Sequence, residues 1–140
     1  MAVTLKRAYE EPGSADGTRV FVDRLWPRGV ARTSARIDWW VKELAPSTAL
    51  RQWFHARPSM WRQFRYRYLE ELRAPEAQAP LQKLYGLAAT GQPVTLVFSS
   101  LDLEHNNAVV LKELLEGMRK PPSSSGPVKN AVPMRARARR

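Results

Sequence analysis

Residues 94–107 read Val94-Thr-Leu-Val-Phe-Ser-Ser-Leu-Asp-Leu-Glu-His-Asn-Asn107, and this stretch decides the fold class. Its first five residues are apolar or β-branched, which predicts a buried strand. Helical patterns flank this strand on both sides, and a strand in that position is typical of a mostly parallel sheet. We therefore expect one compact α/β domain with a small, mostly parallel sheet that is covered by helices.

Two further strands are expected on the N-terminal side of this stretch. Residues 3–9 alternate loosely between apolar and polar types, which indicates an edge strand. Residues 18–23 are β-branched and largely apolar, and Pro27 and Gly29 follow them in an arginine-containing loop. Residues 37–44 are apolar but leave a short strand and a helical turn equally open.

Four helices complete the expected domain. Ser47 can cap a helix that runs to about Phe54, and a second helix is expected over residues 59–73. Pro80 suits the first turn of a third helix that ends at Gly91. The last helix is expected over residues 104–116, with Gly117 as its C-cap.

Composition excludes several classes of chemistry. The 140 residues include no cysteine, so disulfides, thiolate zinc sites and cysteine nucleophiles are excluded. Charge interrupts the N-terminus before any signal-like stretch, and no run of about 18 apolar residues occurs. We expect a cytoplasmic protein with no membrane partner.

The net charge of +10 is concentrated at the C-terminus. Residues 117–140 hold seven of the 23 Lys and Arg residues and no acid, so residues 1–116 carry 16 basic against 13 acidic residues. The same segment is rich in proline and serine and nearly free of large apolar side chains. We expect a domain over residues 1–116 and a flexible basic tail over residues 117–140, which could bind nucleic acid without sequence preference.

Two strand ends carry the candidate site. Ligands of parallel sheets bind beyond the carboxyl ends of the strands. Arg24 and Arg28 follow the strand of residues 18–23, and Asp102, His105 and Asn106 follow the strand of residues 94–98. If the two strands are neighbours, the arginines face the second group across one crevice.

Each of these residues has a predicted role and a structural alternative. Arg24 and Arg28 are predicted anion clamps, His105 is a general acid or base with Asp102 as its partner, and Asn106 is a polar anchor. Trp26, between the arginines, offers an aromatic face to a ligand ring. Alternatively, the Asp, His and Asn side chains only cap the last helix, Asp23 and Arg24 form an ion pair, and Trp26 plugs the loop onto the core.

No metal site is predicted. One histidine near two carboxylates would form a weakly selective set, and adjacent helix positions such as 104 and 105 point apart. The sequence names no cofactor and does not determine the oligomeric state.

An ordered series of motifs runs through the domain: Asp23-Arg-Leu-Trp-Pro-Arg-Gly29 after Asp16-Gly-x-Arg-Val-x-Val22, then Lys42-Glu-Leu-Ala-Pro-Ser47, Leu50-Arg-x-Trp-Phe54, Arg67-Tyr-x-x-Glu-Leu72 and Glu104-His-Asn-x-Ala-Val-Val-Leu111. Over residues 3–116 this series resembles the YeaO-like family of bacterial proteins, a domain-of-unknown-function family (488). The resemblance implies a compact α/β domain and a bacterial cytosolic setting. It does not indicate which reaction, if any, the protein catalyses. Similar proteins often have a lysine just before the acid of the last motif, where this chain has Leu101.

The leading hypothesis is a protein that binds an anionic or nucleotide-like small molecule at the C-terminal ends of its strands. Whether it also acts on that molecule as an enzyme is left open by the sequence. One alternative is a nucleic-acid-associated module that uses the basic tail. Another is an interaction protein without catalysis.

Overall fold

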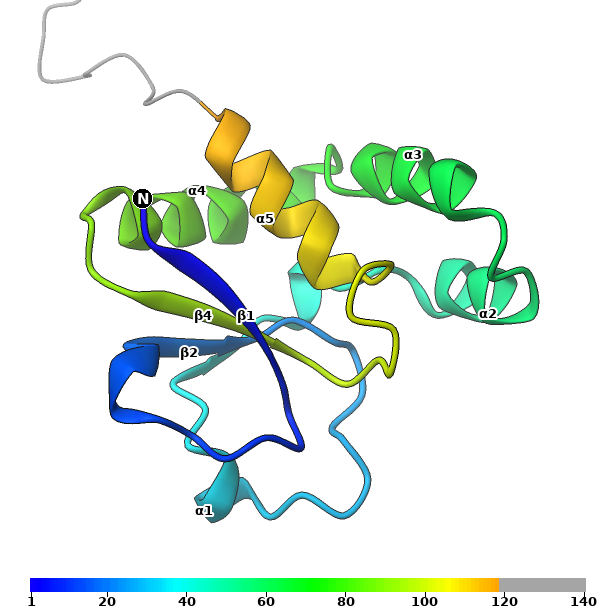
Figure 1. The fold of residues 1–140 in the computed structure, drawn as a ribbon. Helices are drawn as coiled ribbons and strands as arrows, with labels where there is room; N and C mark the ends of the chain where they lie inside the picture. The colour runs from blue at the N-terminus through cyan, green and yellow to red at the C-terminus, as the bar shows by residue number, and fades with distance from the viewer. Residues whose placement is uncertain (119–140) are drawn as a thin grey trace, which may run out of the picture.

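The computed structural model describes residues 1–118, so the predicted flexibility and nucleic-acid contacts of the basic tail lie almost wholly outside the described residues. Figure 1 shows the elements in their order along the chain. They are β1 (Val3–Arg7), η1 (Ser14–Asp16), β2 (Thr18–Phe21), α1 (Arg32–Ala35), β3 (Trp39–Trp40), η2 (Lys42–Leu44), α2 (Thr48–Ala56), α3 (Trp61–Glu71), α4 (Pro75–Ala89), β4 (Val94–Phe98) and α5 (Asn107–Gly117).

The sheet has four strands in the order β1-β4-β2-β3, and every neighbouring pair is parallel. β4 lies between β1 and β2, with Val94 opposite both Val3 and Thr18. All five residues of β4 are buried. The predicted α/β class and the parallel sheet are confirmed, and β1 is the edge strand expected from its loose alternation.

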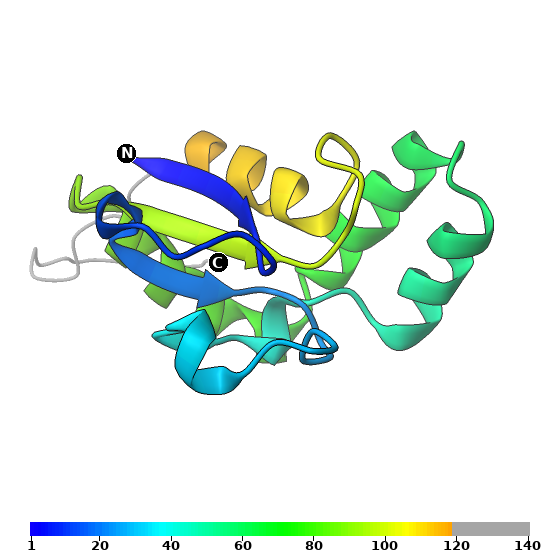
Figure 2. The same ribbon diagram turned by 60° about the horizontal axis from the view of Figure 1, so that its bottom comes forward.

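Alternation along the strands gives the sheet two different faces. Val20, Leu96 and Phe98 belong to the main core, which the helices complete. Phe21 and Val97 point to the opposite face, where they form a small cluster with Ala8. Helices α4 and α5 lie on one side of the sheet and α1 on the other (Figure 1), while α2 and α3 lie past the carboxyl ends of the strands (Figure 2).

The segment of residues 37–44 contains both structures that the sequence left open. Trp39 and Trp40 form the short edge strand β3 beside β2, and residues 42–44 form the 3₁₀ turn η2. The pattern was ambiguous because each element is only two or three residues long.

Two helices begin at residues other than those predicted from the sequence. Helix α4 begins at Pro75 rather than Pro80, because Ala74 is extended and Pro75 needs no N–H at the first helical position. Pro80 lies inside the helix, where it cannot donate to the Glu76 carbonyl. The buried stripe of Ala77, Leu81 and Leu84 continues across it and holds the helix together.

The last helix begins at Asn107 rather than Glu104. Asn106 is its N-cap, with a side-chain oxygen that accepts a hydrogen bond from the Val109 N–H at 3.0 Å. Gly117 is the last helical residue, and the C-cap is Met118 at φ −74°. The predicted Gly117 C-cap is therefore wrong. The helix ends at an extended Met118, so no residue in the left-handed region is needed there.

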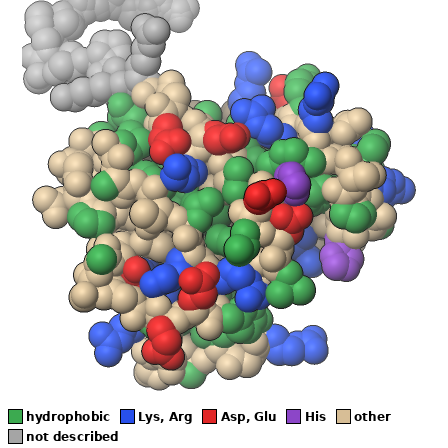
Figure 3. Space-filling view, in the orientation of Figure 1, with side chains coloured by type: hydrophobic (Ala, Val, Ile, Leu, Met, Phe, Trp, Pro, Cys, Tyr) green, Lys and Arg blue, Asp and Glu red, His purple; other side chains and the backbone are tan. Residues whose placement is uncertain are grey.

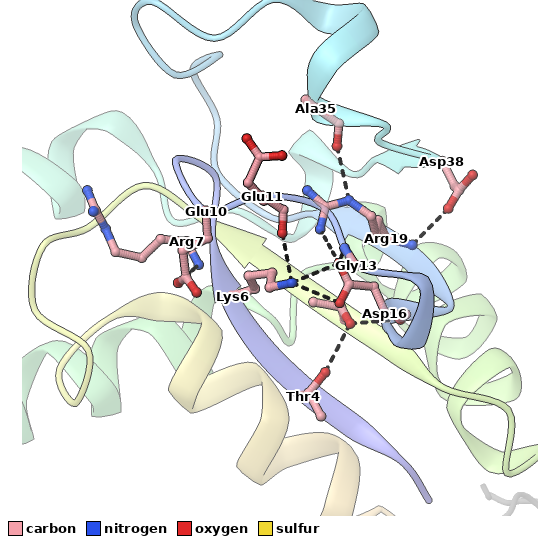
Figure 4. A network of polar contacts seen from close by, with 11 residues as sticks. Thr4, Lys6, Arg7, Glu10, Glu11, Gly13, Asp16, Arg19, Ala35 and Asp38 are labelled. Carbon is pink, nitrogen blue, oxygen red and sulfur yellow. Dashed lines mark hydrogen bonds and ion pairs between the residues drawn. The ribbon is translucent and has the colours of Figure 1, made fainter.

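A buried carboxylate fixes the segment that returns from β1 to β2 (Figure 4). Asp16 accepts hydrogen bonds from Arg19 Nη1 at 2.6 Å, from Lys6 Nζ at 3.0 Å and from the Gly13 N–H at 2.9 Å. Its backbone oxygen accepts a further bond from the Thr95 hydroxyl at 2.7 Å. Burial alone would raise the pKa of Asp16, but these partners together lower it.

Close packing next to Asp16 requires a glycine. Gly17 has φ +65°, and a Cβ at this position would lie 2.1 Å from the Pro93 carbonyl oxygen. Because Gly17 has no side chain, the backbone that leads into β2 can lie directly against Pro93, the residue before β4.

Replacing Asp16 by Ala should lower the free energy of unfolding at pH 7 by about 3–5 kcal/mol, because the Arg19 side chain, only 4% exposed, loses its carboxylate. The matched control is Glu70→Ala, which removes an exposed ion pair with Arg73 and should cost about 0–1 kcal/mol. Urea unfolding measures the free energy of unfolding of both variants.

Because the folded pKa of Asp16 is lowered, the contribution of this carboxylate to stability is present above pH 3.8 and is lost as the pH falls through the folded pKa. Equal effects of the two variants at pH 7 would contradict this role.

Candidate functional site

A cavity of about 670 Å³ opens at the carboxyl ends of β2 and β4. All six residues predicted from the sequence line it: Arg24, Trp26, Arg28, Asp102, His105 and Asn106. They converge because β2 and β4 are parallel neighbours, so the loops that follow them leave the same edge of the sheet. Their individual roles in binding or catalysis stay predictions.

Asp23 joins the two strand ends at the cavity. Its Oδ2 accepts a hydrogen bond from the Ser99 N–H at 2.9 Å, and its backbone oxygen accepts one from Trp40 Nε1 at 2.8 Å. Burial raises the pKa of the Asp23 carboxyl, although hydrogen bonding with Ser99 and Asn107 and the charge of Arg51 oppose the rise. A carboxyl group with a raised pKa in a cavity is a typical functional-site feature.

The arginines after β2 are held by backbone contacts. Arg24 donates from Nε to the Pro46 carbonyl at 3.2 Å and more weakly from Nη2 to the Ala45 carbonyl at 3.4 Å. Asp23 and Arg24 thus have separate partners, and the ion pair between them that the sequence left open is not formed. Arg28 is exposed, and its carbonyl accepts a hydrogen bond from the Tyr9 hydroxyl at 3.1 Å.

Trp26 both lines the cavity and closes the loop onto the sheet. Its Nε1 donates to the Val30 carbonyl at 2.7 Å. Its ring centroid lies 5.3 Å from those of Phe21 and Trp40, in edge-on packing. Trp26 therefore packs the loop against the sheet, as the structural alternative proposed. Its indole N–H is not available to a ligand, because it already donates to the Val30 carbonyl.

The Asp102 side chain closes the turn that precedes α5. Its Oδ1 accepts hydrogen bonds from the N–H groups of Glu104 and His105, both at 3.0 Å, and its Oδ2 lies 3.1 Å from His105 Nδ1. The Glu104 N–H and the His105 side chain lower the pKa of Asp102. The predicted Asp102–His105 pair is present. The predicted capping of α5 is performed by Asn106, whereas Asp102 binds N–H groups in the turn before that helix.

His105 keeps one ring nitrogen for other partners. In the neutral ring, donation from Nδ1 to Asp102 leaves a lone pair on Nε2. The ring also packs edge-on against Trp61, with centroids 5.1 Å apart. These contacts hold His105 in place on the cavity wall.

Arg51, Ser99 and Asn107 are among the polar residues on the cavity wall that were not predicted as site residues. Arg51 lies on α2, the Ser99 hydroxyl is buried without a hydrogen-bond partner in residues 1–118, and Asn107 donates to the Val22 carbonyl at 2.9 Å. Arg51 is brought to the cavity by the start of α2, where Ser47 caps the helix. No local sequence signal reports which face of a short helix meets a distant loop.

A carboxylate from α3 fixes that helix start. Glu71 accepts hydrogen bonds from the Ser47 N–H at 2.7 Å and from the Ser47 hydroxyl at 2.6 Å, and the hydroxyl in turn accepts from the Leu50 N–H. A negative charge at a helix N-terminus is favourable. The contact places α2, and with it Arg51, relative to the sheet.

Within residues 1–118, no three histidine or carboxylate side chains come together as a possible metal site. None of the helices in this range is both long and apolar enough to cross a membrane.

Replacing Asp23 by Asn tests its raised pKa. The folded parent binds the Asp23 proton more readily than the unfolded chain, so this carboxyl adds stability as the pH falls from neutral towards 3.8. The stability of the variant relative to the parent should therefore be higher at pH 7 than at about pH 4.5 in urea unfolding. Glu113→Gln, at an exposed position, is the control. A relative stability that is constant or that rises on acidification would contradict the assignment.

Comparison with known proteins agrees with the resemblance seen in the motifs. The model of the inactive DUF488-N3 subclade matches residues 2–129. The uncharacterised protein Rv3073c of Mycobacterium tuberculosis is 40% identical over 115 residues, which cover 82% of this chain and 94% of that protein. The uncharacterised protein YeaO of Escherichia coli is 39% identical over 118 residues, which cover 84% of this chain and all of that protein. No solved structure shows significant similarity. The chain therefore belongs to the DUF488 family, in the subclade described as inactive.

Proposed function

We propose that the cavity binds a small anionic molecule with a planar body, such as a nucleotide-like group, and that binding rather than catalysis is its function. The observation that carries this proposal is that three arginines, Arg24, Arg28 and Arg51, are among the residues that line one cavity. Arginine offers planar paired donors that match carboxylate and phosphate oxygens.

The size and the walls of the cavity favour such a ligand. About 670 Å³ lies within the usual range of small-molecule sites, about 300–1,000 Å³. Trp26, Phe54 and Phe64 contribute aromatic surface, and Pro46 and Pro58 contribute further apolar surface. A flat ligand body could be desolvated against these side chains while its charge stays with the arginines.

Unused polar groups provide further partners for a ligand. The Ser99 hydroxyl is buried without a partner in the described chain, and burying an unmatched hydroxyl is costly. His105 Nε2 is a further acceptor in the neutral ring, and Asp23 is a partly buried acid on the same wall. These groups suit the ring or sugar part of the ligand better than its charged part.

Three observations favour binding over catalysis. The family model describes its subclade as inactive. Within residues 1–118, no hydrogen bond links His105 to Ser99 or Ser100, so the Asp102–His105 pair has no hydroxyl to activate. Leu101, 83% exposed, stands where similar proteins often carry a lysine.

Thermal unfolding with a panel of nucleoside mono- and diphosphates, sugar phosphates and aromatic carboxylates tests the proposal. A compound that binds, at a free concentration of about 100 times its Kd, should stabilise the parent protein by about 2.7 kcal/mol and raise its Tm. Arg28→Gln should remove most of this shift without lowering the Tm of the free protein, because Arg28 is exposed and its side chain has no hydrogen-bond partner in the described chain.

Arg73→Gln is the matched control, because this arginine is 79% exposed and lies outside the cavity. It should leave the ligand-induced shift unchanged. The proposal is overturned if nothing in the panel shifts the parent, or if Arg28→Gln and Arg73→Gln behave alike. Turnover of a bound compound, lost in His105→Gln, would overturn the non-catalytic part alone.

A further inference from the structure

The two helices α2 and α3 form a hairpin with an unusual charge distribution. From residue 51 to residue 69 the chain has five arginines, one histidine and no acidic residue, and Glu70 and Glu71 follow at the end of α3, so arginines outnumber acids five to two over the hairpin. Basic side chains gather over α3 in the space-filling view (Figure 3). A net charge of this density on one short hairpin produces a positive surface potential.

Arginine and tryptophan side chains stack across the hairpin. The guanidinium carbon of Arg67, on α3, lies 4.2 Å from the ring centroid of Trp53, on α2. The guanidinium carbon of Arg57 lies 5.6 Å from the same ring. Cation–π contacts of this kind hold both guanidinium groups beside the ring at the surface of the hairpin.

Several of these arginines have no neutralising partner. Arg65 pairs with Glu113 at 3.1 Å and Arg73 with Glu70 at 3.6 Å. Arg57, Arg62 and Arg67 form no ion pair within residues 1–118, and residues 119–140 contain no Asp or Glu. Three positive charges on exposed positions are therefore available to an anionic partner.

An exposed aromatic ring accompanies these charges. Tyr66 is 67% exposed, and Arg62 precedes it by one helical turn on α3. An exposed aromatic ring one turn from an unpaired arginine can stack on a nucleobase while the arginine contacts a phosphate. Positive charge without acidic partners complements a phosphate backbone, and the exposed ring adds a surface on which a base can stack.

We propose that the hairpin surface, made of Trp53, Arg57, Arg62, Tyr66 and Arg67, binds single-stranded nucleic acid. The arginines contact successive phosphates and Tyr66 stacks on an unpaired base. None of the five residues lines the cavity, so this surface is separate from the site of the proposed small-molecule ligand. It also differs from the basic tail, because its residues belong to the folded domain.

Fluorescence anisotropy with a labelled oligothymidylate tests the proposal in the full chain. The hairpin variant carries Arg57→Gln, Arg62→Gln and Arg67→Gln, and the matched tail variant carries Arg135→Gln, Arg137→Gln and Arg139→Gln, so each loses three charges. The hairpin variant should bind at least about tenfold more weakly, and the slope of log affinity against log salt should fall by about 2, since single strands release roughly 0.7 counterion per contact.

Tyr66→Ala separates base stacking from charge. It should weaken oligothymidylate binding about fivefold or more and leave binding of inorganic polyphosphate unchanged. Because Tyr66 is exposed, this variant should fold even if the triple arginine variant does not, and the melting temperature checks both.

Several results would overturn the proposal. One is a parent that binds no oligonucleotide, and another is a folded hairpin variant that binds as the parent does, which would assign any binding to the tail. Equal affinity for duplex DNA, or no effect of Tyr66→Ala, would show a general polyanion surface in place of a single-strand site. Weaker binding by the hairpin variant supports the proposal whatever the tail variant does.

Discussion

β2 and β4 pair in parallel, with Phe21 opposite Val97 and the Val22 N–H donating to the Val97 carbonyl at 3.0 Å. Parallel strands end at the same edge of a sheet, so this pairing brings two loops together that are about 75 residues apart in the chain. The bond from the Ser99 N–H to Asp23 continues the contact beyond the last ladder pair. The cavity, its arginines and its Asp102–His105 pair all depend on that shared edge.

The two faces of the sheet stabilise this edge in different ways. Helices bury the apolar face, and the core side chains of β2, β4 and α5 fix the direction in which each strand ends. The opposite face is held by the Asp16 network, whose partners come from β1, from the loop before η1 and from β2. A buried ion pair contributes little net stability but is costly to break, so this network chiefly fixes the path of the chain.

Arginine side chains gather in two separate regions of the described domain, the cavity and the α2–α3 hairpin, for which we propose anionic partners. In the cavity, Arg24, Arg28 and Arg51 share the wall with the partly buried Asp23, and apolar side chains on the same wall strengthen an ion contact by lowering the local dielectric constant. On the α2–α3 hairpin, arginines stack on an indole ring at the surface, where salt screens them. A ligand in the cavity should therefore be held by a few close contacts, and a polymer on the hairpin by many weak and salt-sensitive ones.

The amino-acid sequence determined the local features of this protein. The apolar run of residues 94–98 predicted the central strand. Ser47 and Asn106 lie at helix starts because the side chain of each accepts a hydrogen bond from the backbone N–H three residues ahead. Pro80 and Gly117 do not mark helix ends, because proline is tolerated in a helix that burial stabilises, and a helix can end without a left-handed glycine. The tertiary structure alone decided that Arg51 reaches the cavity and that Arg67 stacks on Trp53. Capping and periodicity act over a few residues, whereas these contacts join segments whose distance is set by how the whole chain packs.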